Sequence, residues 1–279
     1  MTIISPGMIN FAGLKIMNLL ITGAASGLGR TLALDLAREG HDLALFDLNF
    51  ERLGETAREC HELGSDALPI AGDVTKPADC KRFVDAAVGR FGRIDALIAN
   101  AGISMWAKFE DIQDLAVFPK LMEVNYLGVV YCTYHSLPHL KQSRGVIVAI
   151  SSIQGKIGVP YHTGYVASKH AVQGFFNALR TELRGTGVDI LLVLPHWLTG
   201  TRLRQHAYGK DGAPLGNARS RHSRESVTVE ACSKAIIAAM GKRQRELVIP
   251  PKLKALPWLS LISPRLVEYL VTRKVDEQR

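Results

Sequence analysis

The sequence predicts an α/β protein built as a doubly wound sheet of seven parallel strands in a single domain. Apolar runs rich in Leu, Ile and Val recur along the chain and alternate with amphipathic helical patterns. Continuous hydrophobicity within the runs indicates strands that are covered on both faces. A glycine-rich loop directly after the first run is typical of a strand-to-helix turn in such a sheet.

Seven apolar runs are predicted as the strands of this sheet: Ile16–Thr22, Asp42–Phe46, Ala67–Ala71, Ala96–Ala99, Val146–Ile150, Ile190–Leu194 and Leu247–Ile249. Helices are expected between them, over Leu28–Glu39, Glu51–Leu63, Pro77–Phe91, Asp114–Leu140 and Thr163–Leu183. Ligands bind such sheets at the carboxyl ends of the strands, so the candidate site residues are sought there.

Charge argues against a nucleic-acid partner. The net charge is +8, but the basic residues are scattered along the chain. The one dense group lies in a Gly/Ser-rich stretch and comprises Arg219, Arg221, His222 and Arg224. We interpret it as a solvated loop, because a groove that binds single strands interleaves basic and aromatic residues.

The four cysteines predict a reducing, cytoplasmic location. Cys60, Cys80, Cys132 and Cys232 are far apart and lack the short spacings of a zinc site or the density of a disulfide scaffold. No apolar stretch is long enough to cross a bilayer, and no cleavage-site pattern follows the N-terminal run. We therefore expect a cytoplasmic protein without stable membrane insertion, in which Met17 is a candidate natural start.

The loop after the first strand has the composition of a phosphate cradle. It reads G-x-x-x-G-x-G and includes Gly23, Ser26, Gly27, Leu28 and Gly29. Glycines let backbone N–H groups approach a pyrophosphate, and the following helix N-terminus adds partial positive charge. A plain tight turn is the alternative interpretation.

Asp47 follows the second strand, where an acidic side chain accepts both ribose hydroxyls of a dinucleotide. Its charge repels a 2′-phosphate, so the sequence favours NAD over NADP. The nearby cations Arg30 and Arg52 keep NADP open. A helix cap at the strand end is the structural alternative for Asp47.

Tyr165 and Lys169 are four residues apart and therefore share one face of a predicted helix. A nearby ammonium favours phenolate, so we expect it to lower the pKa of the tyrosine towards the working pH. Such a phenol serves as a general acid or base. No metal is required for this chemistry.

Together these motifs resemble the short-chain dehydrogenase/reductase family over Ile16 to Ile249, with its Rossmann-type fold. The resemblance implies that Tyr165 is the acid/base, Lys169 lowers its pKa and holds the nicotinamide ribose, Ser152 orients the substrate oxygen, and Asn125 anchors a relay water. It implies further cofactor contacts at Asp73, Val74, Asn100, Ala101, Gly102, Pro195 and Leu198. A turn role for Ser152 and a helix-bending role for Asn125 are the alternatives.

One segment departs from the family pattern. After Pro195 the family usually has Gly, whereas this chain has His196, and the following hydroxyl falls at Thr199 or Thr201. A side chain at this position puts the cofactor contacts there in doubt. It leaves the catalytic set unchanged.

We expect an NAD-dependent alcohol dehydrogenase or ketone reductase. An NADP-dependent carbonyl reductase, a non-catalytic NAD(H)-sensing protein and a form tethered to membranes through residues 250–275 remain alternatives. Strand-end geometry predicts a largely apolar pocket of Trp106, Phe109, Ile153, Tyr161, His162, Trp197 and Leu198. Such a pocket favours a lipophilic or aromatic secondary alcohol or its ketone, with His162 or His196 as the polar contact.

The chain divides into an N-terminal extension (1–15), a catalytic domain (16–249) and an amphipathic C-terminal extension (250–279). Residues 199–227 follow the sixth strand, where either a substrate lid or a surface loop is expected. Four prolines prevent one long helix in the C-terminal extension, which we expect to pack over the cleft, at a subunit interface or on a membrane surface. The broadly apolar helices Asp114–Leu140 and Thr163–Leu183 predict a homodimer or homotetramer.

Overall fold

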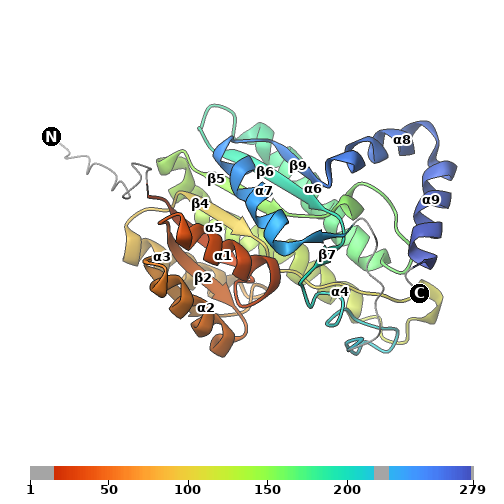
Figure 1. Cartoon of the computed structure of the whole chain (residues 1–279), viewed down its shortest axis with the longest axis horizontal. Coiled ribbons are helices and arrows are strands. Elements are labelled where there is room, and N and C mark those ends of the chain that lie inside the picture. The colour runs from red at the N-terminus through yellow and green to blue at the C-terminus, as the bar shows by residue number, and fades with distance from the viewer. Residues whose placement is uncertain (1–15, 217–225, 278–279) are drawn as a thin grey trace.

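The computed structural model describes residues 16–216 and 226–277 and contains one seven-stranded parallel sheet in the order β3-β2-β1-β4-β5-β6-β9 (Figure 1). Its strands are β1 (Asn18–Thr22), β2 (Asp42–Asp47), β3 (Ala67–Ala71), β4 (Ala96–Ala99), β5 (Val146–Ile150), β6 (Asp189–Pro195) and β9 (Glu246–Ile249). The predicted fold class and all seven predicted strands are therefore confirmed. The chain reverses its direction of winding between β1 and β4, and a crevice forms at such a reversal.

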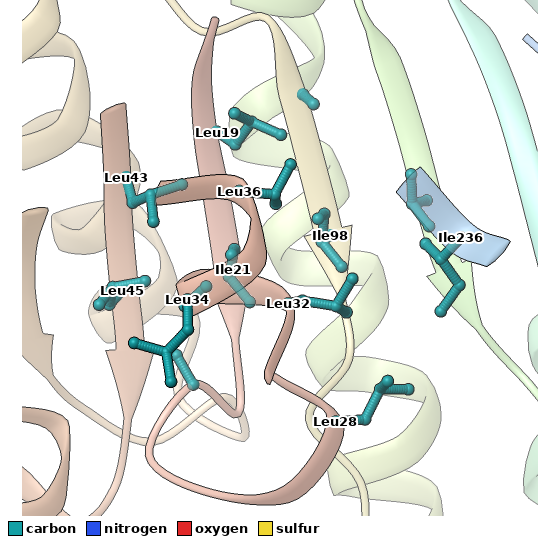
Figure 2. Packing of buried hydrophobic residues seen from close by; sticks show 14 of the residues in the cluster. Leu19, Ile21, Leu28, Leu32, Leu34, Leu36, Leu43, Leu45, Ile98 and Ile236 are labelled. Carbon is teal, nitrogen blue, oxygen red and sulfur yellow. The ribbon is translucent and has the colours of Figure 1, made fainter. Parts of the chain in front are cut away.

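Helices cover both faces of the sheet. One face carries α1 (Gly27–Arg38), α2 (Phe50–Glu62) and α7 (Val229–Gly241), and the other carries α3 (Pro77–Phe91), α5 (Gly128–Ser143) and α6 (Thr163–Glu182). Successive strand residues point to opposite faces, so Leu19 and Ile21 pack under α1 whereas Leu20 packs on the other side. Figure 2 shows Leu32 and Leu36 of α1 lying over these β1 side chains.

The predicted helix Asp114–Leu140 is wrong in detail. The chain instead forms α4 (Val117–Met122), a π-helical turn (Glu123–Leu127) and α5, in direct succession. The π turn contains Asn125, whose side chain is fully buried. Wide turns of this kind are frequent at functional sites, and this one places Asn125 beside α6.

The described part of the segment after β6 contains regular structure, although the sequence shows no periodicity there. Two short strands, β7 (Leu198–Thr199) and β8 (Val227–Thr228), pair in parallel. Tyr208 forms isolated bridges with Met105 and with Pro214, so the described part of the segment lies against the loop after β4. The predicted basic group at 219–224 lies outside the described residues.

The C-terminal extension forms a 3₁₀ turn (Pro251–Ala255), α8 (Leu256–Ile262) and α9 (Pro264–Asp276). Each begins with a proline at its first or second position, which agrees with the expectation that prolines prevent one long helix. Figure 1 shows α8 and α9 in blue at one end of the molecule, away from α1 and α2. Their exposed apolar side chains are Trp258, Leu261, Ile262, Leu266, Tyr269 and Leu270.

Within the described residues, none of the helices has the length and apolar character needed to cross a membrane. No group of three or more His, Cys, Asp or Glu side chains in these ranges is arranged to hold a metal ion. The four cysteines are buried and unpaired.

Candidate active site

A cleft of about 810 Å³ opens at the carboxyl ends of the strands. Its walls come from the loops that follow β1, β2, β3, β4, β5 and β6, and from the segment after β7. Most of the predicted site residues line it: Gly23, Ser26, Gly27, Leu28, Asp47, Asp73, Val74, Asn100, Ala101, Gly102, Trp106, Ser152, His162, Tyr165, Lys169, Pro195, Trp197 and Leu198. Gly29, Asn125 and Tyr161 are not among the residues that line it, although Tyr161 stacks on Trp106.

The glycine loop is shaped by contacts that leave no room for side chains. A Cβ on Gly29 would lie 2.1 Å from the carbonyl oxygen of Gly23. Gly23 has φ +70°, and a Cβ there would lie 2.9 Å from the Cα atom of Ala101. The side-chain amide of Asn100 donates to the carbonyls of Thr22 (3.0 Å) and Gly23 (3.2 Å), which ties the loop to the end of β4.

This loop opens directly into α1, whose N-terminus begins at Gly27 and faces the cleft. Unpaired N–H groups at a helix N-terminus attract anions. The donor set therefore fits the pyrophosphate of a nicotinamide dinucleotide, because backbone and helix dipole both present positive partial charge. Leu28 also faces the cleft, with most of its surface buried.

Asp47 supports the loop as well as facing the cleft. Its Oδ2 accepts a hydrogen bond from the backbone N of Ala25 (3.0 Å), and its Oδ1 accepts one from the backbone N of Asn49 (2.9 Å). Each carboxylate oxygen retains a further lone pair for a ligand hydroxyl. Arg30 is paired with Glu59 at 2.6 Å, whereas Arg52 lines the cleft.

The part of the cleft that follows β3 is held by short local bonds. Asp73 Oδ1 accepts from the backbone N of Thr75 (2.9 Å), and the backbone N of Asp73 donates to Asp79 Oδ2 (3.0 Å). A Cβ on Gly128 would lie 2.8 Å from Val74 Cβ, so α5 presses Val74 into position.

Three side chains of the predicted catalytic set converge in the middle of the cleft. Tyr165 and Lys169 project from one face of α6, and the Lys169 Nζ lies 5.6 Å from the centre of the Tyr165 ring. The same Nζ donates to the carbonyl of Ile150 at 2.9 Å. Ser152 Oγ donates to the carbonyl of Pro195 (3.3 Å) and accepts from the backbone N of Gln154 (3.2 Å).

Burial is the main influence on the pKa values of Tyr165 and Lys169. It raises the pKa of Tyr165 to about 12, and a hydrogen bond with the Ser152 side chain lowers that pKa by less. Burial also lowers the pKa of Lys169 to about 8. The spacing predicted that Lys169 lowers the pKa of Tyr165. That prediction is wrong in direction, because desolvation of the phenol is the largest influence and raises the pKa.

Asn125 makes three hydrogen bonds within the protein. Its Oδ1 accepts from the backbone N of Ile103 (2.8 Å), and its Nδ2 donates to the Ile103 carbonyl (2.9 Å) and to Ser168 Oγ (2.9 Å). The amide therefore joins the loop after β4 to α6. Its predicted contact with a relay water stays a prediction.

An aromatic wall lies beside Tyr165. The Trp106 ring stacks on Tyr161 (centroids 5.7 Å apart), contacts His162 edge-on (4.8 Å) and tilts against Trp197 (5.9 Å). The His162 ring lies 6.2 Å from that of Tyr165. Burial lowers the pKa of His162 to about 4, so the imidazole is neutral at ordinary pH.

Three residues expected in the pocket are absent from its lining: Phe109, Ile153 and Tyr161. Phe109 is exposed and contacts Phe118, with ring centroids 5.9 Å apart. Ile153 is buried in a small core cluster with Leu194 and Val248. Ile153 is three residues after the end of β5 and Phe109 is ten residues after the end of β4, and the turn geometry that directs these side chains elsewhere leaves no periodic signal.

His196 lies at the end of β6, where its backbone N donates to the carbonyl of Ile249 at 2.8 Å. Its ring lies 6.1 Å from that of Trp197, and the residue lines the cleft. The chain therefore accommodates a side chain where the family pattern has glycine.

Sequence reasoning missed Arg204. Its guanidinium carbon lies 4.1 Å from the centre of the Trp106 ring and 5.9 Å from that of Trp197. Stacking of this kind joins the segment after β7 to the aromatic wall. No motif marks Arg204, because the surrounding residues have no helical or strand periodicity.

Comparisons with known proteins agree with this geometry. A model of the short chain dehydrogenase family matches residues 17–211. The chain is 36% identical over 251 residues to 11-beta-hydroxysteroid dehydrogenase-like 3 of Arabidopsis thaliana, covering 90% of this chain and 78% of the relative. It is 39% identical over 236 residues to 11-beta-hydroxysteroid dehydrogenase-like 6 of the same plant, covering 83% and 69%.

Two solved structures share the architecture. An alcohol dehydrogenase from the archaeon Thermococcus sibiricus, complexed with 5-hydroxy-NADP, is 26% identical with a TM-score of 0.72, covering 84% of this chain and 96% of that chain. A short chain dehydrogenase/reductase from Burkholderia phymatum, in complex with NAD, is 24% identical with a TM-score of 0.79, covering 90% and 95%, and shows the fold alone. Because the family model spans most of the sheet and relatives above 30% identity align over most of both chains, the protein belongs to the short-chain dehydrogenase family and is an oxidoreductase that acts on CH–OH groups.

Proposed function

We propose that the protein is an NAD-dependent dehydrogenase or reductase of a lipophilic or aromatic secondary alcohol or its ketone, with Tyr165 as the acid/base. The observation that carries this proposal is the position of Tyr165 between Ser152, Lys169 and the aromatic wall. A nicotinamide dinucleotide bound at the glycine loop supplies hydride transfer to or from the substrate carbon.

The proton is handled by the chain's own residues. Tyr165 gives its phenolic proton to the carbonyl oxygen in reduction and, as phenolate, removes the hydroxyl proton in oxidation. Ser152 orients the same oxygen through its hydroxyl. Lys169 provides a buried positive charge that favours the phenolate, and its Nζ is held by Ile150.

Asp47 supports the choice of NAD. Its carboxylate faces the end of the cleft that follows β2, where it offers acceptors to ribose hydroxyls and repels a 2′-phosphate. Arg30, one of the two cations that favour NADP, is already paired with Glu59. Arg52 keeps an NADP-dependent carbonyl reductase as the second candidate.

The aromatic wall supports the substrate class. Trp106, Trp197 and the neutral His162 present large, weakly polar surfaces next to the acid/base, which gain affinity by burying hydrocarbon. The Arabidopsis relatives are named as hydroxysteroid dehydrogenases, and a steroid alcohol is a lipophilic secondary alcohol of this kind. His162 and His196 are the proposed polar contacts.

Tyr165→Phe tests the mechanism, with Tyr134→Phe on an exposed part of α5 as the matched control. The Tyr165 variant should lose turnover while it retains NAD affinity, because only the transferable proton is removed. Substantial residual turnover would contradict the role of Tyr165. A protein that binds NAD(H) but turns over no substrate from a panel of sterols, aryl alcohols, simple secondary alcohols and sugars would instead be the NAD(H)-sensing alternative.

We further propose that the catalytic domain assembles as a homodimer or homotetramer through α5 and α6, and that the C-terminal extension is a separate packing element. Tyr134 is 73% exposed on α5, and Trp258 is 71% exposed on α8, which leaves apolar surface on both elements. Sedimentation at micromolar concentration tests the assembly. Removal of residues 251–279 should change solubility, assembly or substrate affinity, and an unchanged protein would make the segment dispensable.

A further inference from the structure

A second cavity, of about 570 Å³, opens at the other edge of the sheet from the catalytic cleft. It forms where α5, α6 and α7 end and where β5, β6 and β9 begin. Five arginines line it: Arg144, Arg180, Arg184, Arg243 and Arg245. Among its described lining residues the one acidic side chain is Asp189. We call this site the arginine cavity.

Two of the arginines build the site. Arg180 donates to the carbonyls of Ile190 (3.1 Å) and Arg245 (3.2 Å). Arg243 pairs with Asp189 at 2.6 Å and donates to the carbonyl of Arg144 at 2.6 Å. These bonds join the loops before β5, β6 and β9. The pair with Arg243 also occupies Asp189, the one carboxylate among the described lining residues.

The other three arginines have no such role. Within the described residues, the side chains of Arg144, Arg184 and Arg245 form no ion pair and no hydrogen bond, and all three are exposed. The stem of Arg144 packs on Gly187, where an added Cβ would lie 2.9 Å from Arg144 Cγ. Three guanidinium groups are therefore presented around the opening without a partner among the residues that the structure describes.

Charge in the arginine cavity exceeds what the fold itself neutralises. Five guanidinium groups and one carboxylate leave four net positive charges. The C-termini of α5, α6 and α7 each contribute about half a negative charge, together about 1.5, so more than about two positive charges remain. The charge of Arg245 also lowers the pKa of Arg180, after burial as the larger cause. Arg180 Nε is buried and without a partner in the described part of the chain.

We propose that the arginine cavity binds a phosphate-bearing anion at a site separate from the dehydrogenase cleft. Guanidinium forks match phosphate oxygens in paired hydrogen bonds, and a multivalent anion relieves the repulsion among the arginines. The volume is that of a small-molecule site and accommodates a phosphorylated ligand. Either a soluble phosphate ester or the phosphomonoester headgroup of a lipid supplies this chemistry.

Isothermal titration of the full chain with inorganic tripolyphosphate tests the proposal. No dinucleotide is added, because the phosphate groups of NADH and NADPH would compete for the arginine cavity. Uptake of the probe by the glycine loop is the same in wild type, control and test variant, which share that loop. The test variant carries Arg184→Gln and Arg245→Gln, which remove two charges without breaking a bond in the described residues. Arg58→Gln with Lys234→Gln, both exposed and outside the cavity lining, is the control of equal charge.

Wild type and control should bind tripolyphosphate alike, and the test variant should bind it at least about tenfold more weakly. Tripolyphosphate should also raise the melting temperature of the wild type more than that of the test variant. If the double variant fails to melt cooperatively, each single substitution gives the same comparison with a smaller change. No binding by the wild type, or equal binding by wild type and test variant, overturns the proposal.

Sedimentation with vesicles distinguishes the two sources of phosphate. The lipid headgroup is the ligand if three results agree. The wild type sediments with vesicles of phosphatidic acid in phosphatidylcholine, it does not sediment with phosphatidylcholine alone, and the test variant stays in solution with both. Tripolyphosphate binding without vesicle sedimentation indicates a soluble phosphate ester. If the test variant still sediments with these vesicles and still binds tripolyphosphate like the wild type, the arginine cavity is not the phosphate site.

Discussion

The buried pair Tyr165 and Lys169 predicts opposite pH dependences for the two directions of the reaction. The pKa of Tyr165 is raised to about 12 and that of Lys169 is lowered to about 8, both by burial. Below about pH 8, the tyrosine is therefore protonated and the lysine charged. In the proposed mechanism, reduction uses the phenol of Tyr165, whereas oxidation uses its phenolate.

The magnitudes follow from the fractions of the active forms. In reduction, the form with a neutral phenol and charged lysine is constant below about pH 8 and then falls about tenfold per pH unit. In oxidation, the form with phenolate and charged lysine rises about tenfold per pH unit up to about pH 8. Above that point it levels off, because each gain in phenolate is cancelled by an equal loss of ammonium.

The assay measures kcat/KM in both directions from about pH 6 to about pH 10, through the nicotinamide absorbance. Lys169→Gln should remove the break near pH 8, because a neutral amide does not titrate, while Lys141→Gln at the exposed end of α5 should keep it. A reduction rate that increases with pH would refute the reasoning. So would a break that survives in Lys169→Gln.

Three further predictions concern the cofactor, the substrate and the core. Asp47→Ala should reduce the ratio of kcat/KM with NAD to that with NADP by about tenfold or more, since a repulsive charge is lost; a ratio that already favours NADP in the wild type would contradict the assignment. Trp197→Ala should lower kcat/KM for hydrophobic alcohols by about tenfold and leave polyols nearly unchanged, and a uniform loss would count against the aromatic wall. Leu32→Ala, at a side chain with 0% exposure in α1, should lower the free energy of unfolding by about 2–5 kcal/mol in urea titration, and a loss below about 1 kcal/mol would show that the site collapses around the cavity.

The sheet could be predicted from the sequence because its strands are buried on both faces. Each of the seven apolar runs became a strand with bounds shifted by two residues or fewer. The helix Pro77–Phe91 was predicted to the residue, since proline occupies its first turn and Gly92, with φ +69°, ends it. Strong local signals of this kind are independent of tertiary context.

Features set by tertiary contacts were not predictable. The π-helical turn at Asn125 interrupts a helix whose residues have an ordinary helical pattern. Arg204 reaches Trp106 from a segment without periodicity, and the β7–β8 pair joins residues nearly thirty positions apart. The four-residue spacing predicts that Tyr165 and Lys169 share one helix face. Their burial is known only from the structure, and it is the largest influence on both pKa values.

The two hydrogen bonds of Asp47 have a consequence for changing the cofactor of this enzyme. The carboxylate that faces the cleft after β2, where the ribose is proposed to bind, also accepts from Ala25, inside the glycine loop. Removing the side chain therefore releases the loop while it removes the charge, and lower affinity for both dinucleotides would obscure any gain in preference. Asp47→Asn reduces the overlap of the two effects, because its amide oxygen can continue to accept from Ala25 while the charge and the bond from Asn49 are lost. Conversion towards NADP should start from Asp47→Asn. The neighbouring Leu48 should be replaced by a basic residue only after this variant is shown to keep its affinity for dinucleotides.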